Sequence, residues 1–574
     1  MCAIAAIVRK KGLLPNDKHI VENMLRMQLH RGPDGSGHKV FDHCVLGQNR
    51  LSMLDLRNLS LPTQNHNGQL TLIYNGEIYN YQELRKELEA SYDFKTRSDS
   101  EVVLAAYEKW GPDCVKKFNG MFSFFIWDNK NERGFAARDP LGVKPFFYYS
   151  NKTLFTCASE ASVLVQSKLM EFKINEDYLC EYLIAPYFTG SVSTPFKNVE
   201  VLLPGHTLTV SNGSLSIEKY FSYHFNPSDS VDASDWKTLL KDAVNKTLHA
   251  DSEVGLFLSG GLDSTLIASL SDKKLKTWTI RYEDNKEEDY KKALIVKSED
   301  YDFAVSASQQ LGHELHDVKV TATDYPELLI KTLEKNDLIS AWEQEVSQHA
   351  LALAAAQHVK AVLVGDAADE THFGYPFLLG KNMVASVQNV IQFFGHVPLR
   401  KVNAVADFSD FYRSYSIESG YNWKTLPDQR FAMSKIIVDF WLRRLLHNGD
   451  THTMAHSLEA RVPFADINVL HAAQLLKPIE GPEKFHLRQV ASTAVSPELA
   501  QRPKSALTKN LKAQATIHRY FVEYWKKYGE TLTDIVDPDT VTSWTKRTSE
   551  NLSDYDVGLE FRLLATLIWR RRFL

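Results

Sequence analysis

The sequence predicts a two-domain protein that combines the α/β and α+β classes. Its 574 residues are more than one hydrophobic core organises, so two or more domains are expected. Around residues 220–236 the chain becomes polar and loses its apolar period, which is typical of a linker. Beyond it, short apolar runs alternate with helical patterns, and this alternation predicts a parallel sheet with crossover helices. We therefore expect a domain over 1–215, a linker over 216–235 and a second domain over 236–574.

The second domain contains apolar runs that are predicted to be the strands of this sheet: Val254–Leu258, Leu275–Ile280, Leu315–Val320 and Ala361–Val364. A helix capped by Ser234 or Asp235 is expected to precede the first strand. The end of the chain is predicted to be mainly helical, with helices over Gln429–Leu446 and Leu470–Leu476. Ligands of parallel sheets bind beyond the C-terminal ends of the strands, so the site is expected in the loops that follow them.

The composition excludes several classes of function. Hydrophobic residues make up 44% of the chain and charged residues 24%, as in ordinary globular proteins. A formal net charge of -5 gives no support for a nucleic-acid partner. No run of about eighteen apolar residues is present, so no membrane partner is expected. The five cysteines lack metal-binding spacing and the first residues lack a signal-peptide pattern, which together predict a reducing, cytoplasmic location.

A glycine-rich loop follows the first predicted strand of the second domain and reads Ser259-Gly260-Gly261-Leu262-Asp263-Ser264. Adjacent glycines allow a sharp turn and a close approach of the backbone to a ligand. The hydroxyl groups and the free N–H groups at the start of the next helix favour a phosphate. Asp263 would repel that phosphate unless a divalent cation lay between them, so magnesium is implied. No Lys-Ser or Lys-Thr pair closes the loop, so it is not a Walker loop.

A second group of carboxylates follows the strand at Ala361–Val364, in the string Gly365-Asp366-Ala367-Ala368-Asp369-Glu370. Acidic residues this close together are unfavourable unless they are solvated or bind a cation. An exposed acidic turn would account for the string alone. A magnesium site shared with Asp263 would need such a cluster after a second strand, and Asp369 is the candidate. Two later strings, Glu483–Arg488 and Gln501–Ser505, also stand out.

Cys2 is the candidate nucleophile of the first domain. A side chain this small after Met1 usually permits removal of the methionine, which would give Cys2 a free α-amine. The unperturbed pKa of that amine, about 8, suits it to act as the base for the thiol. Taken alone, Cys2 is more often a small residue beside an unprocessed methionine, so the motifs that follow decide between the two.

Four short strings after Cys2 supply groups for a zwitterionic substrate. The loop His30–Gly35 is followed by Arg50, which is suited to grip a carboxylate. Asn75 and Gly76 are expected in a turn after a strand over Leu70–Tyr74, where the amide and an N–H group can form an oxyanion hole. Glu77 can receive an ammonium group, and Asp99 opens a helix over Glu101–Trp110. Singly, each string is more often a turn, a helix cap or a surface ion pair.

Together, these motifs resemble the glutamine-hydrolysing asparagine synthetase family. Residues from Cys2 to about 210, including Ala137–Phe146, resemble its class II glutamine amidotransferase domain. Residues 236 to about 505 resemble its ATP-pyrophosphatase synthetase domain. The resemblance implies an N-terminal-nucleophile hydrolase with αββα layers, followed by a parallel sheet with a helical C-terminal part. It implies ATP and Mg²⁺ as cofactors, and glutamine and a carboxylate acceptor, aspartate first, as substrates. A homodimer is left open.

The resemblance also assigns roles by motif. Cys2 would attack the glutamine amide carbon, Asn75 and Gly76 would hold the oxyanion, and the amino-acid end of glutamine would bind the set Arg50, Glu77 and Asp99. The loop 259–264 and Gly365 would bind ATP and pyrophosphate, with Asp263 and Asp369 on the metal ion. Lys504 and Asp366 lie at catalytic positions of the family. Ammonia would cross a dry, apolar passage between the domains and attack an acyl-adenylate.

Two departures from the family pattern affect the acceptor. Asp366 replaces a glutamate, and Ala367, which does not easily adopt a positive φ, replaces a glycine. The segment Asp337–Glu343 lacks the family's proline, and Glu283–Asp300 is a polar insertion. Alternatives therefore stay open: amidation of another carboxylate such as a secondary metabolite or sugar acid, a glutaminase with a non-functional synthetase half, a non-catalytic regulatory homologue, and a ring-forming synthetase of the β-lactam type.

Overall fold

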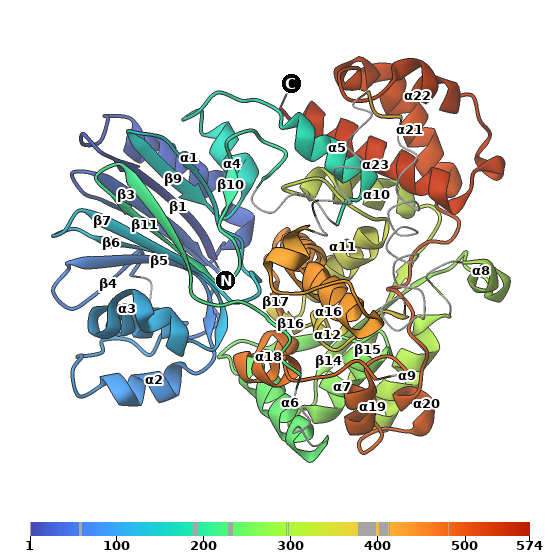
Figure 1. The fold of residues 1–574 in the computed structure, drawn as a ribbon, viewed down its shortest axis with the longest axis horizontal. Coiled ribbons are helices and arrows are strands. Elements are labelled where there is room, and N and C mark those ends of the chain that lie inside the picture. The colour runs from blue at the N-terminus through green and yellow to red at the C-terminus, as the bar shows by residue number, and fades with distance from the viewer. Residues whose placement is uncertain are drawn as a thin grey trace.

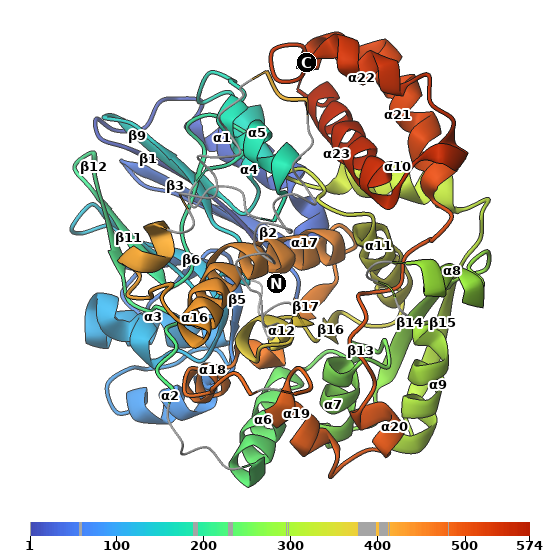
Figure 2. The same cartoon turned by 45° about the vertical axis from the view of Figure 1, so that its right-hand side comes forward.

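The computed structural model describes residues 2–573 apart from 57–59, 188–192, 228–232, 294–295, 297, 377–397, 401–410, 412–413 and 480. The predicted removal of Met1, part of the expected linker and part of the insertion over Glu283–Asp300 therefore lie outside the described residues. Two domains lie side by side, one built from the first part of the chain and one from the rest (Figure 1). Both views place the N-terminus at their junction, beside β17 (Glu459–Arg461) (Figures 1 and 2).

The first domain contains two antiparallel sheets, with strand orders β10-β8-β9-β1-β3-β2 and β12-β11-β7-β6-β5-β4. The first sheet consists of β1 (Cys2–Arg9), β2 (Gly35–Val40), β3 (Cys44–Arg50), β8 (Phe147–Ser150), β9 (Leu154–Ala158) and β10 (Glu200–Val201). The second consists of β4 (Thr63–Gln64), β5 (Leu70–Ile78), β6 (Gly120–Asp128), β7 (Arg133–Arg138), β11 (His206–Ser211) and β12 (Ser214–Lys219). The segment expected as linker thus begins inside β12.

Apolar side chains point to both faces of the sheet along β1, so both faces are covered. Ile4 and Ala6 belong to the core between the two sheets, whereas Ala5 and Ile7 face the core on the helical side. Helices α1 (Asp17–Met27) and α4 (Ala161–Gln166) cover that side, and α2 (Tyr81–Leu88) and α3 (Asp99–Trp110) cover the second sheet. The resulting αββα layers confirm the predicted fold.

The second domain is built on a wholly parallel sheet with the order β15-β14-β13-β16-β17. Its strands are β13 (Val254–Phe257), β14 (Lys276–Tyr282), β15 (Glu314–Val320), β16 (Ala361–Leu363) and β17. The four predicted strands are confirmed. The fifth, β17, was not predicted because its three residues include two charged side chains and show no apolar run.

Helices flank this sheet and form most of the end of the chain, as predicted. They are α6 (Ala233–Thr247), α7 (Leu262–Leu270), α8 (Glu287–Lys292), α9 (Asp300–Leu311), α10 (Tyr325–Lys335), α11 (Gln344–Ala355), α12 (Ala368–Thr371), α16 (Leu426–Ile436), α17 (Arg443–Met454), α18 (Ile467–Ala473), α19 (Phe485–Ala491), α20 (Pro497–Ala500), α21 (Gln514–Tyr528), α22 (Pro538–Trp544) and α23 (Asp554–Arg571). The predicted caps Ser234 and Asp235 lie inside the first turn of α6, so that cap prediction was wrong. Among the described helices, none is both long and apolar enough to cross a membrane.

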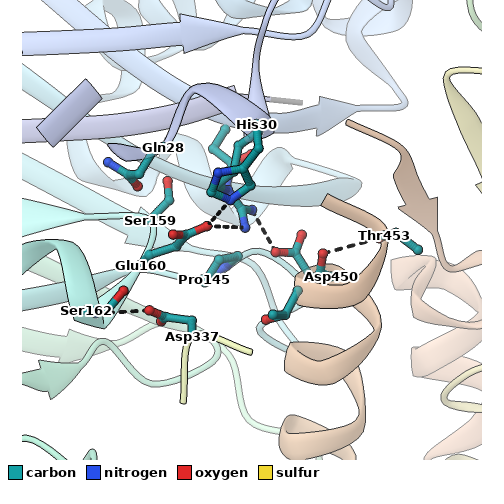
Figure 3. A network of polar contacts seen from close by, with 12 residues as sticks. Gln28, His30, Pro145, Ser159, Glu160, Ser162, Asp337, Asp450 and Thr453 are labelled. Atoms are coloured by element: carbon teal, nitrogen blue, oxygen red, sulfur yellow. Dashed lines mark hydrogen bonds and ion pairs between the residues drawn. The ribbon is translucent and has the colours of Figure 1, made fainter. Parts of the chain in front are cut away.

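A buried cluster of charges joins the two domains. Arg31 of the first domain donates to Asp450 of α17 at 2.6 Å, and Lys144 Nζ lies 3.5 Å from the other oxygen of the same carboxylate. All three side chains are at most 2% exposed. Glu160 accepts from His30 at 2.8 Å (Figure 3), and the same oxygen lies 3.5 Å from Arg31 Nη1. Each buried cation therefore has a carboxylate partner, as burial requires.

Two further contacts extend this interface. Asp337 of the second domain accepts the N–H groups of Ala161 and Ser162, which begin α4 in the first domain (Figure 3). Leu51, next to Arg50, packs against Met454 at the end of α17. The apolar passage expected for ammonia stays a prediction. The described contacts between the domains combine this apolar pair with buried ion pairs.

Replacing Asp450 by Asn should destabilise the protein strongly. The buried cations Arg31 and Lys144 would then face a neutral amide in place of a carboxylate. We expect the free energy of unfolding to fall by about 3–5 kcal/mol, measured by chemical denaturation. Lys360→Ala is the matched control, since it removes a largely exposed ion pair with Asp34 across the same interface. That pair should contribute at most about 1 kcal/mol. Similar losses in the two variants would contradict the assignment of the interface strength to the buried cluster.

Candidate active sites

Cys2 begins the central strand β1 and lies directly opposite Arg50 of β3. Its side chain is 7% exposed, and the Gln48 amide donates to its Sγ at 3.3 Å. Burial raises the pKa of the Cys2 thiol above its usual value. A buried thiol of this kind would need a base to act as a nucleophile.

Asn75 and Gly76 lie beside Cys2, but within β5 rather than in a turn. The predicted Asn-Gly turn was wrong because β5 continues to Ile78 and pairs both residues with β6. A Cβ at Gly76 would come within 2.2 Å of the Met121 carbonyl oxygen, so close strand packing requires the glycine. Asn75 Oδ1 accepts from the Cys2 N–H at 3.1 Å, while its buried Nδ2 has no hydrogen-bond partner among the described residues.

Arg50 and Asp99 are both held in place by local hydrogen bonds. Arg50 donates through Nη2 to the carbonyl groups of Leu54 and Asp55, at 2.7 and 2.9 Å. Asp99 lies in the first turn of α3, near the helix start as predicted, and the Ser98 side chain caps the helix. Its carboxylate accepts from the Tyr74 hydroxyl at 2.6 Å and from the Ile78 N–H at 2.9 Å. Tyr74 was not found from the sequence, because the apolar strand pattern concealed its hydroxyl group.

Glu77 faces the second domain. Arg461 of β17 lies 3.5 Å from its carboxylate and also contacts Glu459 at 2.6 Å. Burial and then the charge of Asp99 raise the pKa of Glu77 to about 8, although Arg461 acts in the opposite direction. The proposed receptor for the ammonium group of glutamine is therefore in contact with a cation of the synthetase domain.

The glycine loop turns between β13 and α7, as predicted. Gly260 has a φ of +68°, and a Cβ there would lie 2.4 Å from the backbone of Ala304. Ser259 and Ser264 hydrogen-bond each other and the loop backbone at 3.2 Å. Arg502, which sequence reasoning did not assign, donates to the Ser259 carbonyl at 3.0 Å. The loop is thus rigid, with the first turn of α7 directed to its concave side.

The structure brings Asp263 and Asp369 together around a single ammonium group. Lys484 Nζ lies 2.6 Å from the carboxylate of Asp263 and 2.7 Å from that of Asp369. Lys504 Nζ contacts the second oxygen of Asp369 at 2.5 Å. Burial alone raises the pKa of Asp369, but the two ammonium groups lower it to about 2. Lys484 carried no predicted role, although its string Glu483–Arg488 was noted in the sequence.

This arrangement fits magnesium as a shared ion. Two carboxylates that contact one ammonium group are close enough to share one cation, and Mg²⁺ binds one or two protein carboxylates together with substrate phosphates. Among the described residues, no group of three or more His, Cys, Asp or Glu side chains could hold a metal alone. Substrate phosphates would therefore have to complete the coordination.

The loop after β16 adopts the conformation that its sequence disfavours. Ala367 has a φ of +72°, the left-handed region in which a Cβ is strained. Gly365 packs against α7, where a Cβ would lie 3.0 Å from that of Asp263. Asp366 is half-buried, and burial followed by the charge of Asp369 raises its pKa to about 6. Ala367 therefore holds this loop in a strained backbone conformation.

These groups line one cavity of about 820 Å³ at the C-terminal edge of the parallel sheet. The lining includes most of the glycine loop, Gly365, the Asp263–Lys484–Asp369 cluster and Lys504. Residues of α11 and α17 and several aromatic side chains complete it. The sequence-predicted ATP, metal and lysine residues are thus brought together, whereas Cys2 and its neighbours form a separate site in the first domain.

Comparison with known families agrees with this division. A family described as Glutamine amidotransferase domain matches residues 1–221, and one described as Asparagine synthase matches residues 235–570, more than half of the chain. The chain belongs to the asparagine synthase family. It is a glutamine-dependent carbon–nitrogen ligase of that family, with a glutaminase half and a synthetase half.

Relatives match across both halves. Asparagine synthetase [glutamine-hydrolyzing] 1 of Bacillus subtilis is 28% identical over 563 residues, which cover 88% of this chain and 86% of the relative. Asparagine synthetase [glutamine-hydrolyzing] 3 of the same organism is 29% identical over 539 residues, covering 89% and 87%. A solved glutamine phosphoribosylpyrophosphate amidotransferase of B. subtilis aligns with a TM-score of 0.29 and 15% identity over 55% of this chain and 66% of that one.

The strain at Ala367 predicts that Ala367→Gly stabilises the protein. Relief of the left-handed conformation should contribute about 1–2 kcal/mol, partly offset by about 0.5–1 kcal/mol of added backbone freedom. We expect a small net rise in the free energy of unfolding, measured by denaturation. Ala350→Gly in α11 is the control and should lower it by about 1 kcal/mol. Destabilisation of equal size by both variants would show that Ala367 is unstrained.

Proposed function

We propose that this protein uses glutamine nitrogen and ATP to convert a carboxylate into an amide through an acyl-adenylate. Cys2 Sγ attacks the glutamine amide carbon and ammonia leaves, and water then releases glutamate. At the second site the acceptor carboxylate attacks the α-phosphorus of ATP, and pyrophosphate leaves. Ammonia attacks the acyl carbon, AMP leaves, and loss of a proton gives the amide.

One observation carries this proposal: the carboxylates of Asp263 and Asp369 meet at one cation position beside a rigid glycine loop. Helix N–H groups and Lys504 surround the same cavity and can bind negatively charged phosphate oxygens. Magnesium bound by the two carboxylates would neutralise charge on the departing pyrophosphate. Lys484, which bridges the carboxylates, would be free to pair with phosphate once they hold a metal ion.

The glutaminase half supports its proposed step through Asn75. Its buried Nδ2 lacks a partner among the described residues while its Oδ1 is fixed by the Cys2 N–H group. A donor held ready beside a nucleophile can hydrogen-bond an oxyanion without reorganisation. We assign the oxyanion to Asn75 and Gly76, and the amino-acid end of glutamine to Arg50, Asp99 and Glu77.

Helix α17 is the element through which the two sites are coupled. Asp450 and Met454 contact the first domain, while Asn448, Gly449 and Thr453 line the synthetase cavity. Ammonia released into water would be protonated and lose its nucleophilicity, so a protected route along this helix would retain it. Two classes of acceptor follow: aspartate, because the relatives are asparagine synthetases, and a carboxylate of another kind.

A single coupled assay tests the function. Protein, ATP, magnesium and glutamine are mixed with aspartate or other acids, and pyrophosphate and glutamate are measured together. We expect acceptor-dependent pyrophosphate, and its loss on addition of EDTA, because chelation removes the magnesium that would neutralise charge on the departing pyrophosphate. Glutamate without pyrophosphate, for every acid tried, would instead indicate a glutaminase with a non-functional synthetase half.

Cys2→Ala should separate the two halves. Without the thiol, glutamine-driven amide formation should fall at least about 1,000-fold, since nucleophilic attack is lost. Synthesis from added ammonium chloride should stay within about twofold, since Cys2 lies outside the synthetase cavity. Amide and pyrophosphate are measured with either nitrogen source. A parallel fall in both rates would contradict the division of labour.

A further inference from the structure

Strand β17 lies between the two active sites. The guanidinium group of Arg461 lies 3.5 Å from the Glu77 carboxylate of the first domain and 2.6 Å from that of Glu459. Ala460, between the two β17 residues, lines the synthetase cavity instead. This division follows the alternation of side chains along a strand. The second domain thus contributes a buried cation to the surroundings of the proposed glutamine site.

Arg461 is held in place by the second domain. Its side chain is fully buried, and Nη1 donates to the carbonyl groups of Thr247 and His249 at 2.8 and 2.9 Å. Its own carbonyl group accepts from the Val364 N–H group at 2.9 Å, directly before Gly365. The position of the guanidinium group therefore depends on the strands that also carry the loop after β16.

The contact between Arg461 and Glu77 leaves the carboxylate oxygens able to accept from a ligand. Arg461 Nη2, the atom that faces Glu77, is buried and forms no hydrogen bond with a described residue. At 3.5 Å it acts on Glu77 through its charge. An ammonium group can therefore still donate to the same carboxylate.

Charges on several neighbouring elements decide whether Glu77 is ionised. Burial first and then Asp99 of α3 raise its pKa to about 8, and Glu459 of β17 acts in the same direction. Arg461 is the largest influence in the opposite direction, and the α-amine of the chain adds to it. The other titratable neighbours are hydroxyl groups whose pKa is raised by burial: Tyr74, Tyr79 and Tyr81. Without Arg461, Glu77 would be protonated near neutral pH and could not pair with an ammonium group.

We infer that Arg461 is a positioning residue of the glutaminase half and makes glutamine binding depend on the seating of β17. It does so by keeping negative charge on Glu77, which pairs with the ammonium group of glutamine. This inference rests on the proposed function and adds the regulation of its first site. Displacement of β17 would withdraw Arg461 and weaken glutamine binding, so ammonia is released only when the two halves are docked.

Binding of glutamine to Cys2→Ala tests this role without turnover, because the nucleophile is absent. The dissociation constant is measured by calorimetry for Cys2→Ala and for Cys2→Ala/Arg461→Met. We expect the second protein to bind at least about tenfold more weakly near neutral pH, the effect of one unit in the pKa of Glu77. Cys2→Ala/Arg281→Met is the matched control and should bind like Cys2→Ala, since Arg281 forms a partly exposed pair with Asp317. Equal or tighter binding without Arg461 would overturn the inference.

The pH dependence separates an effect of charge from one of packing. As the pH rises, Glu77 ionises even without Arg461, so the ratio of the two dissociation constants should fall at least about threefold between about pH 7 and about pH 9. Titration of glutamine itself affects both proteins alike and cancels in the ratio. A ratio that stays constant over this range would show a packing defect and would overturn the role of the charge.

Glu459→Gln supplies a test of opposite sign that holds even if Arg461→Met unfolds the chain. Removing this second carboxylate lowers the pKa of Glu77, so Cys2→Ala/Glu459→Gln should bind glutamine at least about twofold more tightly near neutral pH. A disturbed packing does not tighten binding. Weaker or unchanged binding in this variant would overturn the inference.

Failure of the inference and failure of the function give different results. Absence of glutamine binding by Cys2→Ala itself would overturn the assignment of glutamine to this site, and the inference with it. Glutamine binding that is indifferent to Arg461 and Glu459 would overturn the inference alone and leave the ligase function intact.

Discussion

The structure depends on the neutralisation of buried charge between its two domains. Asp450 alone faces both Arg31 and Lys144, and all three are removed from solvent. Isolated charges in such an environment are strongly unfavourable, so the three side chains constrain how the domains meet. They also fix α17, whose other face lines the synthetase cavity. The orientation of one catalytic half is thereby tied to the position of the other.

A similar principle organises the nucleotide end of the cavity. Asp263 and Asp369 belong to loops after different strands, yet they share the ammonium group of Lys484. Lys484 supplies the positive charge that these two carboxylates need in a buried position. Close packing of Gly365 on α7 and the left-handed Ala367 bring the second loop to this position. Backbone strain and charge pairing therefore act on the same few residues.

The lining of the synthetase cavity combines groups of different character. It contains ion-paired cations and aromatic rings, and the buried Oε1 atoms of Gln344 and Gln348 have no partner among the described residues. The first domain also holds groups of both charges. Arg50 of β3 lies opposite Cys2, whereas the carboxylates come from Glu77 of β5 and Asp99 of α3. Family membership shows a glutamine-dependent carbon–nitrogen ligase whose two halves are matched by separate family models.

The sequence by itself determined the strands of the parallel sheet and the glycine loop, whereas the αββα layers and the class of ligase followed from the resemblance to a family. Those features depend on short-range patterns: apolar period, adjacent glycines, and carboxylates next to strand ends. Only the tertiary structure placed Lys484 between the two carboxylates, Arg461 against Glu77 and Asn75 inside a strand. These outcomes depend on residues up to several hundred positions apart, and no local pattern contains them. Packing also decided that Ala367 adopts a positive φ, because the surrounding loop and helix outweigh the preference of one residue.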